Sequence, residues 1–321
     1  MENSKESKVI KNKWSIVDIP DQSGKIAIVT GANCGTGYEI SKALASKGAE
    51  VIMACRDVEK GESAAEKIKK EFPKSSLKVM VLDLADLSSV KNFCQLFREN
   101  YNSLNILCNN AGIMAIPKLK SKDGFELQLA TNHLGHFALT GLLFDKILMT
   151  PKSRIVNVSS TAHQSGKIDF DDLMKEKKYS RFSAYSQSKL ANLLFTYELQ
   201  RRLEAEGHST ISVGTHPGLA ATNLASSGPG YGKGRIIKSI ISFFTKLFSQ
   251  SAEMGALPIL CACTSLDING GDYLGPGGFR GMRGYPKKDE SSKESHDVEV
   301  AKKLWDISTE LTKVKYVFKK S

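Results

Sequence analysis

From residue 24 onward, short apolar runs alternate with longer segments in which apolar positions recur at helical spacing. The apolar runs are continuous and rich in β-branched residues, which is typical of strands buried on both faces of a sheet. Strands that alternate with helices are joined by parallel crossovers, so the pattern predicts an α/β fold with a doubly wound parallel sheet. We predict strands at residues 25–30, 50–55, 77–82, 104–108, 154–159, 210–214 and 271–274, and helices at 38–47, 58–72, 88–100, 124–148 and 183–205.

The segment after residue 222 has a different pattern from the rest of the chain. Residues 226–234 (SSGPGYGKG) are rich in glycine and serine, but they lie inside the fold, which favours a mobile loop near a site over a domain boundary. In residues 235–248 the apolar positions follow a helical period, with Lys238 and Lys246 on the other side. No linker divides the chain, so we expect a single domain.

Composition adds little to this picture, whereas the charge raises a question about partners. Of the 321 residues, 41% are hydrophobic and 25% are charged, as in ordinary globular proteins. The formal net charge is +11, and part of the excess lies at the two ends. We expect solvated tails there; a membrane surface is the alternative partner, and no nucleic acid is expected because no aromatic residues interleave with the lysines. These lysines are Lys5, Lys8, Lys11, Lys13, Lys313, Lys315, Lys319 and Lys320.

The sequence indicates neither a targeting segment nor a metal site. The N-terminus is polar and basic, and no run of 18 apolar residues occurs, so we expect a cytoplasmic protein. The six cysteines are scattered singly, without the spacing of zinc ligands, which favours reduced thiols and predicts no metal centre.

A glycine-rich turn joins the first predicted strand to the first predicted helix, with the sequence Thr30-Gly31-Ala32-Asn33-Cys34-Gly35-Thr36-Gly37. Glycine lets backbone amides approach a pyrophosphate closely, and a helix N-terminus offers unpaired N–H groups and a positive dipole end. Because the turn lies between a strand and a helix of an α/β pattern, it predicts a dinucleotide site rather than a merely structural turn.

The TGxxxGxG spacing of this turn is similar to that of the short-chain dehydrogenase/reductase family. The resemblance implies a Rossmann-type fold and a nicotinamide cofactor. Relatives carry a small or basic residue in place of Cys34 and an aliphatic one in place of Thr36. We expect the polar Thr36 to lose some packing under the cofactor but still to bind the cofactor through its backbone. The cofactor contacts implied in this turn are Gly31, Asn33, Cys34, Gly35, Thr36 and Gly37.

The end of the second predicted strand bears on the choice between NAD and NADP. Asp57 lies 20 residues beyond Gly37, where an acidic residue would bind the ribose hydroxyl of NAD. However, Asp57 is well placed as the N-cap of the following helix, and the strand itself ends at Cys55, followed by Arg56. The guanidinium of Arg56 suits a 2′-phosphate, so we predict NADP (NADPH), with a plain surface role for Arg56 as the alternative.

Further stretches match family motifs in the family's order, over about residues 24–274. The resemblance implies an aspartate-hydrophobe pair that meets the adenine ring, an NNAG motif that faces the cofactor, and a Pro-Gly turn with a threonine near the carboxamide. The corresponding cofactor contacts are Asp83, Leu84, Asn110, Pro217, Gly218 and Thr222.

Tyr185 and Lys189 form the pattern Tyr-Ser-Gln-Ser-Lys in a predicted helix. Residues four apart share a helix face, so the ammonium lies beside the phenol. A phenol with a pKa of about 10 is a poor base, and a nearby cation favours its ionised form, which predicts a tyrosine that exchanges a proton with an alcohol or carbonyl oxygen. The resemblance adds cofactor contacts by both residues, with Lys189 on the nicotinamide ribose.

Two more residues complete the catalytic set that the resemblance implies. Ser160 ends the fifth predicted strand, and its hydroxyl is expected to hold the substrate oxygen; Ser159 is the competing serine. Asn132 matches the family residue that distorts its helix and holds a water molecule connected to the lysine. His133, His136 and His163 have no serine in a nucleophile elbow beside them, so we interpret them as packing or surface residues.

Several details resemble the retinol-dehydrogenase-like branch, which includes the WW-domain oxidoreductases. They are the ACRD, NHLGHF, YSQSKLAN and GGDYLGP stretches at residues 54–57, 132–137, 185–192 and 270–276. The resemblance implies C-terminal lid helices within residues 225–250, and the helix at 235–248 is interpreted as a lid, an interfacial helix on a membrane, or an ordinary packed helix. We divide the chain into a basic N-terminal extension (1–22), a dinucleotide-binding oxidoreductase domain (23–285) and a C-terminal basic tail with a helix (286–321).

The leading hypothesis is an NADP(H)-dependent carbonyl reductase or alcohol dehydrogenase for a lipophilic small molecule, such as a retinoid, steroid or aldehyde. The alternatives are a non-catalytic NADP(H)-binding sensor or scaffold, a protochlorophyllide-reductase-like enzyme, and a peripheral membrane protein held by its basic tails. By analogy with relatives, we expect a homo-oligomer formed through the helices after the fourth and fifth strands.

Overall fold

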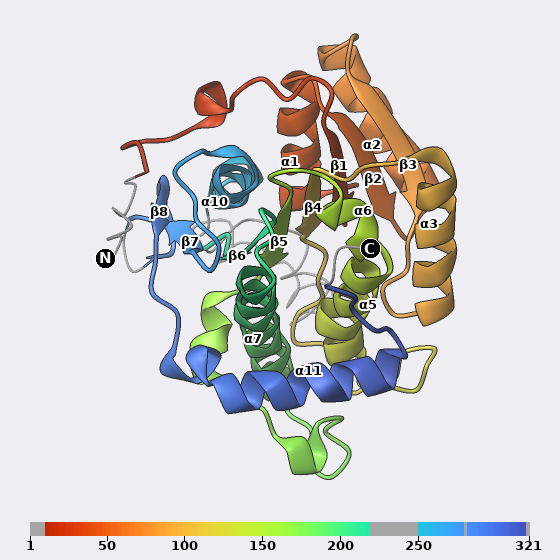
Figure 1. Ribbon diagram of the computed structural model, residues 1–321, viewed down its shortest axis with the longest axis vertical. Helices are drawn as coiled ribbons and strands as arrows, with labels where there is room; N and C mark the ends of the chain where they lie inside the picture. Colours follow the sequence, from red (N-terminus) through yellow and green to blue (C-terminus); the bar gives the residue numbers. More distant parts are fainter. Residues whose placement is uncertain (1–9, 219–249, 279–280, 319–321) are drawn as a thin grey trace, which may run out of the picture.

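The computed structural model describes residues 10–218, 250–278 and 281–318. Its centre is an eight-stranded sheet in the order β3-β2-β1-β4-β5-β6-β7-β8, parallel except for β8, which pairs antiparallel with β7 (Figure 1). The predicted doubly wound parallel sheet is therefore confirmed. The strands are β1 (Ile26–Thr30), β2 (Glu50–Cys55), β3 (Ser76–Val81), β4 (Ile106–Asn109), β5 (Arg154–Val158), β6 (Ile211–Thr215), β7 (Tyr273–Pro276) and β8 (Pro286–Lys288).

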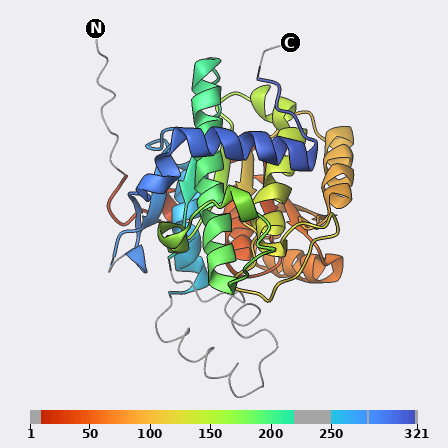
Figure 2. The same cartoon turned by 90° about the horizontal axis from the view of Figure 1, so that it is seen from below.

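Helices cover both faces of the sheet, which explains why the central strands are apolar on both sides (Figures 1 and 2). One face packs against α1 (Gly35–Ser46), α2 (Val58–Glu71) and α10 (Ala252–Thr264). The other packs against α3 (Leu87–Asn100), α5 (Gly135–Leu142), α6 (Phe144–Leu148) and α7 (Arg181–Ala205). The remaining elements are α4 (Leu127–Leu129), α11 (Val298–Thr312), a π-helical turn η2 (Ala130–Leu134), and the short 3-10 turns η1 (Ile16–Asp18), η3 (Thr161–Ser165), η4 (Phe170–Asp172) and η6 (Lys293–His296).

The predicted strands all appear within one or two residues of their expected bounds, but the helix predicted at residues 124–148 is divided. It begins only at Leu127, passes through the π-helical turn η2, and is interrupted at Leu143. The periodicity of apolar residues is the same for these variants of helix, so the sequence pattern could not separate them.

Several helices begin where an aspartate caps their first turn. The Asp57 carboxylate accepts a hydrogen bond from the backbone N–H of Lys60 at 3.1 Å, as predicted from its position before α2. Asp86 does the same for α3 with the N–H groups of Ser88 and Ser89. Such side chains satisfy donors that the first turn of a helix leaves unpaired.

The N-terminal extension is only partly a solvated tail. Trp14 and Ile19 are each 3% exposed and belong to the core between the sheet and α1 and α10. Lys11 forms an ion pair with Asp18 in η1. The described part of the extension is thus attached to the domain, because its apolar side chains are buried there.

The C-terminal segment is also packed against the domain. Helix α11 lies across α7 and α5 (Figure 1), and Trp305 on its inner face meets the ring of Phe137 at 5.2 Å and that of Phe195 at 5.8 Å. Beyond the helix, Tyr316 lies 4.9 Å from Phe137 and donates a hydrogen bond to the carbonyl oxygen of that residue. These four side chains form an aromatic cluster on the outer side of α5 and α7. An oligomer formed through this side would require the segment to move away.

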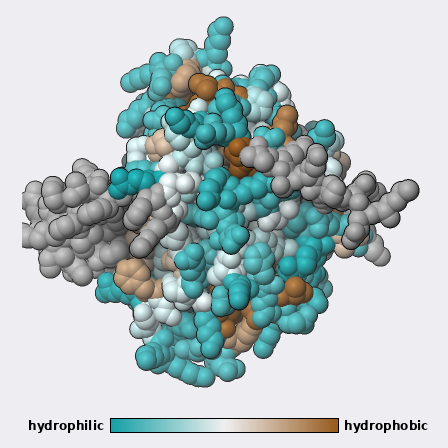
Figure 3. All heavy atoms as spheres, turned by 90° about the vertical axis from the view of Figure 1, so that its left-hand side faces the viewer, coloured by the Kyte–Doolittle hydropathy of each residue, from teal (hydrophilic) through white to brown (hydrophobic). Residues whose placement is uncertain are grey.

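Figure 3 shows one face of the molecule, on which hydrophilic side chains predominate and hydrophobic ones are scattered. Among the described residues, no helix combines the length and the apolar character needed to cross a bilayer. The lid expected at 225–250, including the helix at 235–248, lies almost entirely outside the described residues.

Replacement of Trp305 by alanine should destabilise the protein by about 3–5 kcal/mol, because it leaves a cavity in the aromatic cluster. The exposed neighbour Asp306 serves as the control, since its replacement by alanine should change the free energy of unfolding by less than about 0.5 kcal/mol. Urea denaturation measures both variants. Equal stability of the two would show that α11 contributes nothing through this ring.

Candidate active site

The glycine turn has a backbone that only glycine can supply at its centre. Gly31 and Gly35 have φ values of +67° and +57°, in the left-handed region that disfavours side chains. A Cβ atom on Gly37 would lie 2.2 Å from the Gly31 carbonyl oxygen and 2.7 Å from Asn110 Nδ2. The turn therefore packs backbone against backbone and directs the first N–H groups of α1 outward, as a pyrophosphate cradle requires. Cys34 at its N-cap position is exposed, unlike the other five cysteines.

Thr36 does not lose packing, contrary to our expectation. It is 8% exposed, and its hydroxyl donates a hydrogen bond to Asn110 Oδ1 at 3.0 Å. The Asn110 amide in turn donates to the carbonyl oxygen of Thr30 at 2.8 Å. A polar residue fits here because the NNAG loop supplies the acceptor, and the glycine turn is thereby joined to that loop.

At the end of β2, Asp57 is engaged by the first turn of its own helix. The Asp57 carboxylate is engaged by the Lys60 N–H and by Lys60 Nζ, 2.6 Å away. These contacts hold the pKa of Asp57 below its usual value, mainly through the side-chain hydrogen bond of Lys60. Arg56 is exposed beside it. A carboxylate committed to its own helix is a weaker candidate for a ribose hydroxyl than the neighbouring guanidinium is for a phosphate.

Other expected cofactor residues lie along the same edge of the sheet, where the parallel strands end. Asp83 and Leu84 follow β3, and Leu84 is buried against Gly135, whose Cβ would lie 2.3 Å from the Leu84 carbonyl oxygen. Pro217 and Gly218 follow β6. Asn33 is half-buried in the glycine turn, and Thr222 lies outside the described residues.

Tyr185 and Lys189 lie on adjacent turns of α7, as the spacing predicts. Lys189 Nζ is 5.8 Å from the centre of the Tyr185 ring and donates a hydrogen bond to the carbonyl oxygen of Val158 at 3.0 Å. Both side chains are buried, at 7% and 4% exposed. The pair is therefore held next to the last residue of β5, where the chain turns toward Ser160.

Burial changes the ionisation of this pair in a direction that the helix spacing did not predict. It raises the pKa of Tyr185, and the hydrogen bond with Ser160 opposes this only in part. Burial also lowers the pKa of Lys189 to about 8. Desolvation penalises every charged form, so in the protein chain itself it outweighs the expected stabilisation of the phenolate by Lys189. The phenol is accordingly held protonated at neutral pH.

The structure separates the two candidate serines. Ser159 is 2% exposed, and its hydroxyl donates to the backbone carbonyl of Lys189 at 2.8 Å, which is a structural contact with α7. Ser160 is half-buried and hydrogen-bonds Tyr185. His163, itself 1% exposed, contacts the backbone of Ser160, because its Nδ1 lies 2.6 Å from the Ser160 carbonyl oxygen. Of the two, only Ser160 is directed at the tyrosine.

Asn132 is completely buried in the π-helical turn, so the local helix distortion expected at this residue is present. Its Oδ1 accepts the N–H of Ile113 at 2.8 Å, and its Nδ2 donates to the Ile113 carbonyl at 3.0 Å and to Ser188 Oγ at 2.8 Å. The side chain thus ties the loop after β4 to α7, between Tyr185 and Lys189.

The histidines beside Asn132 are buried, in agreement with a packing role. Burial lowers the pKa of His133 to about 3 and that of His136 to about 4, so both rings are neutral at physiological pH. His133 Nε2 lies 2.9 Å from Ser308 Oγ in α11. His136 contacts Thr30 and Asn132.

The Pro-Gly turn after β6 has partners that the sequence reasoning missed. The Gly218 N–H donates to His216 Nδ1 at 3.3 Å, so His216 Nε2 carries the proton and donates to Asp289 Oδ2 at 3.0 Å. Gln250 Nε2 donates to the Pro217 carbonyl oxygen at 2.9 Å. Asp289 follows β8 and is far from the turn in sequence, so no motif spacing could have revealed it.

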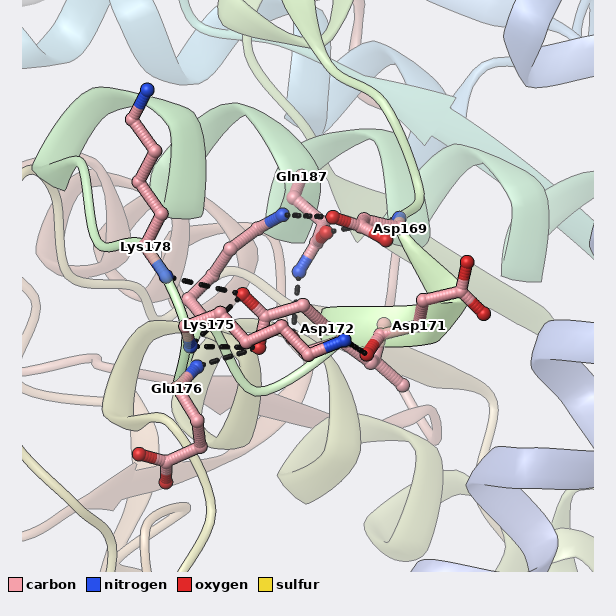
Figure 4. Close-up of polar contacts among 9 residues, drawn as sticks. Asp169, Asp171, Asp172, Lys175, Glu176, Lys178 and Gln187 are labelled. Atoms are coloured by element: carbon pink, nitrogen blue, oxygen red, sulfur yellow. Dashed lines mark hydrogen bonds and ion pairs between the residues drawn. The ribbon is translucent and has the colours of Figure 1, made fainter.

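The loop between Ser160 and Tyr185 is held by its own polar network (Figure 4). The Asp172 carboxylate accepts the N–H groups of Glu176 at 2.7 Å and of Lys177 and Lys178, and Lys175 pairs with Asp169 at 3.4 Å. Gln187 accepts the N–H of Asp169 at 3.3 Å and so attaches the loop to α7, two residues from Tyr185. The loop is anchored at the helix that carries the tyrosine.

Comparisons with known sequences point to one family. Residues 25–228 match the family model for short chain dehydrogenases. Human retinol dehydrogenase 12 is 41% identical over 298 residues, which cover 91% of this chain and 88% of that protein. Human retinol dehydrogenase 13 is 41% identical over 291 residues, covering 90% and 84% of the two chains.

Comparisons with solved structures agree. An uncharacterized protein from Mycobacterium paratuberculosis superposes with a TM-score of 0.77 and 38% identity, covering 95% of this chain and all of that one (100%). A candidate NAD(P)-dependent gluconate 5-dehydrogenase from Beutenbergia cavernae, whose structure contains NADP, gives a TM-score of 0.61 at 21% identity over 79% of this chain and 95% of that one. At that identity, the second likeness shows the fold alone.

His133 and His136 should make stability fall on mild acidification. Their pKa values are lower in the folded than in the unfolded protein, so the unfolded state takes up protons first as the pH falls below about 6.5, and this continues down to about 4 for His136 and about 3 for His133. Each histidine should contribute a slope of up to about 1.4 kcal/mol per pH unit in this window.

Urea denaturation at pH 7, 6 and 5 (chosen to lie across roughly that window) measures the slope, with His133→Phe as the comparison because it removes one of the two groups. The variant should show a shallower fall in the free energy of unfolding between these pH values. Parallel curves would mean that His133 is not held neutral by burial.

Proposed function

The chain belongs to the short-chain dehydrogenase family, and on that premise we propose that it is an NADP(H)-dependent oxidoreductase that reduces a lipophilic carbonyl compound or oxidises the corresponding alcohol. The observation that carries the proposal is the grouping of Tyr185, Lys189 and Ser160 at the end of β5, with the phenol in hydrogen-bond contact with the serine.

The described residues fit a dinucleotide. The glycine turn leaves no room for a side chain on Gly37 and presents the N-terminus of α1, which suits a pyrophosphate. Arg56 would meet a 2′-phosphate, while the Asp57 carboxylate is occupied by Lys60. NADPH, when bound, would supply the hydride for the carbonyl carbon. Cofactor contacts from Asp83, Leu84, Asn110, Pro217, Gly218 and Thr222 belong to the same proposal.

Within this proposal each residue of the catalytic set has one task. Ser160 donates a hydrogen bond to the substrate oxygen and so favours the charge that develops there. Tyr185 gives its phenolic proton to that oxygen during reduction, and the raised pKa of the buried phenol keeps this proton on the tyrosine until then. Lys189 holds the nicotinamide ribose and, in its charged form, eases proton loss from the tyrosine. Asn132 fixes the loop after β4 beside them.

A lipophilic substrate is supported by the relatives, which are named retinol dehydrogenases. A retinoid, steroid or long-chain aldehyde would fit a lid with the apolar face of residues 235–248. Contact of that helix with a membrane surface, a cytoplasmic location and a homo-oligomer remain parts of the same proposal. Because α11 covers α5 and α7, the interface of such an oligomer is expected elsewhere on the chain.

The rival hypothesis is a non-catalytic NADP(H)-binding sensor on the same fold. The buried, mutually oriented Tyr185, Lys189 and Ser160 disfavour it, because a sensor needs the glycine turn but not a phenol paired with a serine. A protochlorophyllide-reductase-like enzyme is the second alternative. A screen of aldehydes, ketones and alcohols, with the absorbance of NADPH as the signal and NADH alongside, separates the leading proposal from both alternatives.

Tyr185→Phe should lower kcat by about 100-fold or more, because it removes the proton donor and leaves the ring in place. The KM for NADPH should change little. Tyr101→Phe serves as the matched control, since its hydroxyl bonds Glu50 on β2, away from this site. Turnover retained in Tyr185→Phe would refute the proposed mechanism.

Arg56→Ala should raise the KM for NADPH by about 10- to 100-fold, since a hydrogen bond to a charged group contributes about 1.5–3 kcal/mol. The KM for NADH should stay nearly constant. Lys60→Ala, one turn into α2, removes a neighbouring charge and should have a smaller effect on NADPH. Equal use of NADPH and NADH by the unmodified protein would overturn the role given to Arg56.

A further inference from the structure

His136 lies outside the residues to which the family resemblance assigns a role, yet its ring connects the two halves of the candidate site. It is 2% exposed at the start of α5, just after the π-helical turn. Its Nδ1 lies 3.0 Å from the carbonyl oxygen of Asn132, and its Nε2 lies 2.9 Å from Thr30 Oγ1. The ring therefore joins the end of β1, where the glycine turn begins, to the turn that carries Asn132.

The donor and the acceptor can be assigned for each hydrogen bond that links Asn132, His136 and Thr30. A carbonyl oxygen only accepts, so His136 Nδ1 carries the proton, and the neutral ring leaves Nε2 as an acceptor for the Thr30 hydroxyl. The Thr30 oxygen accepts the N–H groups of Asn110 and Ala111, both at 2.9 Å. One tautomer thus satisfies all of these buried groups, and burial, which lowers the pKa of His136 to about 4, keeps the ring neutral.

Asn132, at one end of this hydrogen-bonded link, lies close to Lys189. A Cβ atom on Gly112 would lie 3.2 Å from Asn132 Oδ1 and 3.3 Å from Lys189 Nζ, so both atoms face the same point. The Asn132 amide also bonds Ser188, on the helix between Tyr185 and Lys189. A shift of the Asn132 backbone would consequently change the surroundings of the Lys189 ammonium.

We propose that His136 is a positioning residue for the reaction, which fixes the backbone of Asn132 against Thr30 and thereby keeps Asn132 in register with Lys189 and Ser188. This inference rests on the proposed function. The two ends of the link are unequal, because the Thr30 hydroxyl also has the Cys108 carbonyl oxygen 3.4 Å away, whereas the His136 ring is the side chain that contacts the Asn132 carbonyl oxygen. Loss of the ring therefore affects proton transfer more than cofactor binding.

The test uses His136→Phe, which keeps a flat ring and removes both hydrogen bonds, and His136→Gln, which retains one donor and one acceptor. The matched control is His133→Phe, which changes a buried histidine in the preceding π-helical turn that contacts Ser308 in α11 instead. For each variant, kcat, the KM for NADPH, the pH profile of kcat and the midpoint of thermal unfolding are measured.

His136→Phe should lower kcat by about 10- to 100-fold, in line with the effect of a small misplacement at a reacting group. The KM for NADPH should stay within about threefold, which is less than 1 kcal/mol. The alkaline limb of the pH profile, set by Lys189 and Tyr185, should shift, and His136→Gln should recover part of the activity. His133→Phe should lower the unfolding midpoint but leave kcat and the pH profile unchanged.

Two results would overturn the inference. One is a His136→Phe enzyme with normal kcat; the other is a loss of kcat with an unshifted pH profile and no recovery in His136→Gln, which would indicate a purely structural role. If His136→Phe does not fold, Thr30→Val carries the same test, since it removes the hydroxyl that contacts His136 Nε2. Failure of the proposed function itself is recognised separately, because it leaves Tyr185→Phe active.

Discussion

Parallel strands that end at one edge of a buried sheet leave backbone groups that water cannot reach, and each of them needs a hydrogen-bond partner. In this protein those partners are the candidate site residues themselves. The Val158 carbonyl oxygen accepts from Lys189 and Asn192, and the Thr30 carbonyl oxygen accepts from Asn110. The same contacts that close the end of the sheet therefore hold the lysine and the NNAG loop in place. Stability and the arrangement of the site depend on one set of hydrogen bonds.

Burial of these contacts decides the electrostatics. Lys189 and Tyr185 are both desolvated, so the pKa of the ammonium falls to about 8 while the pKa of the phenol rises. An i, i+4 pair on an exposed helix would have behaved in the opposite way for the tyrosine. The protein instead holds a protonated phenol against Ser160, which is the form required to give a proton to a carbonyl oxygen. The ionisation of the pair follows from its depth in the fold, and the helix spacing alone does not determine it.

The C-terminal segment has a structural part in the same arrangement. Helix α11 covers the outer side of α7, the helix that carries Tyr185 and Lys189, and Ser308 reaches His133 in the π-helical turn. Trp305 and Tyr316 fill the space that α5 and α7 leave between their aromatic side chains. The segment thus supports the catalytic helices from the side opposite the sheet. Its sequence position, after the last predicted strand, gave no indication of this.

The amino-acid sequence determined the α/β class, the positions of the parallel strands and the identity of the candidate residues, because periodicity and short motifs are local properties of the chain. It also indicated that Asp57 caps a helix whereas Arg56 does not, because an N-cap residue is identified by its position directly before the helix. It indicated a helix distortion at Asn132 only through the family resemblance, and it could not determine the link from Thr30 through His136, the contact of His216 with Asp289, or the raised pKa of Tyr185. Each of these depends on residues distant in sequence or on the depth of burial, and only the tertiary structure brings those together.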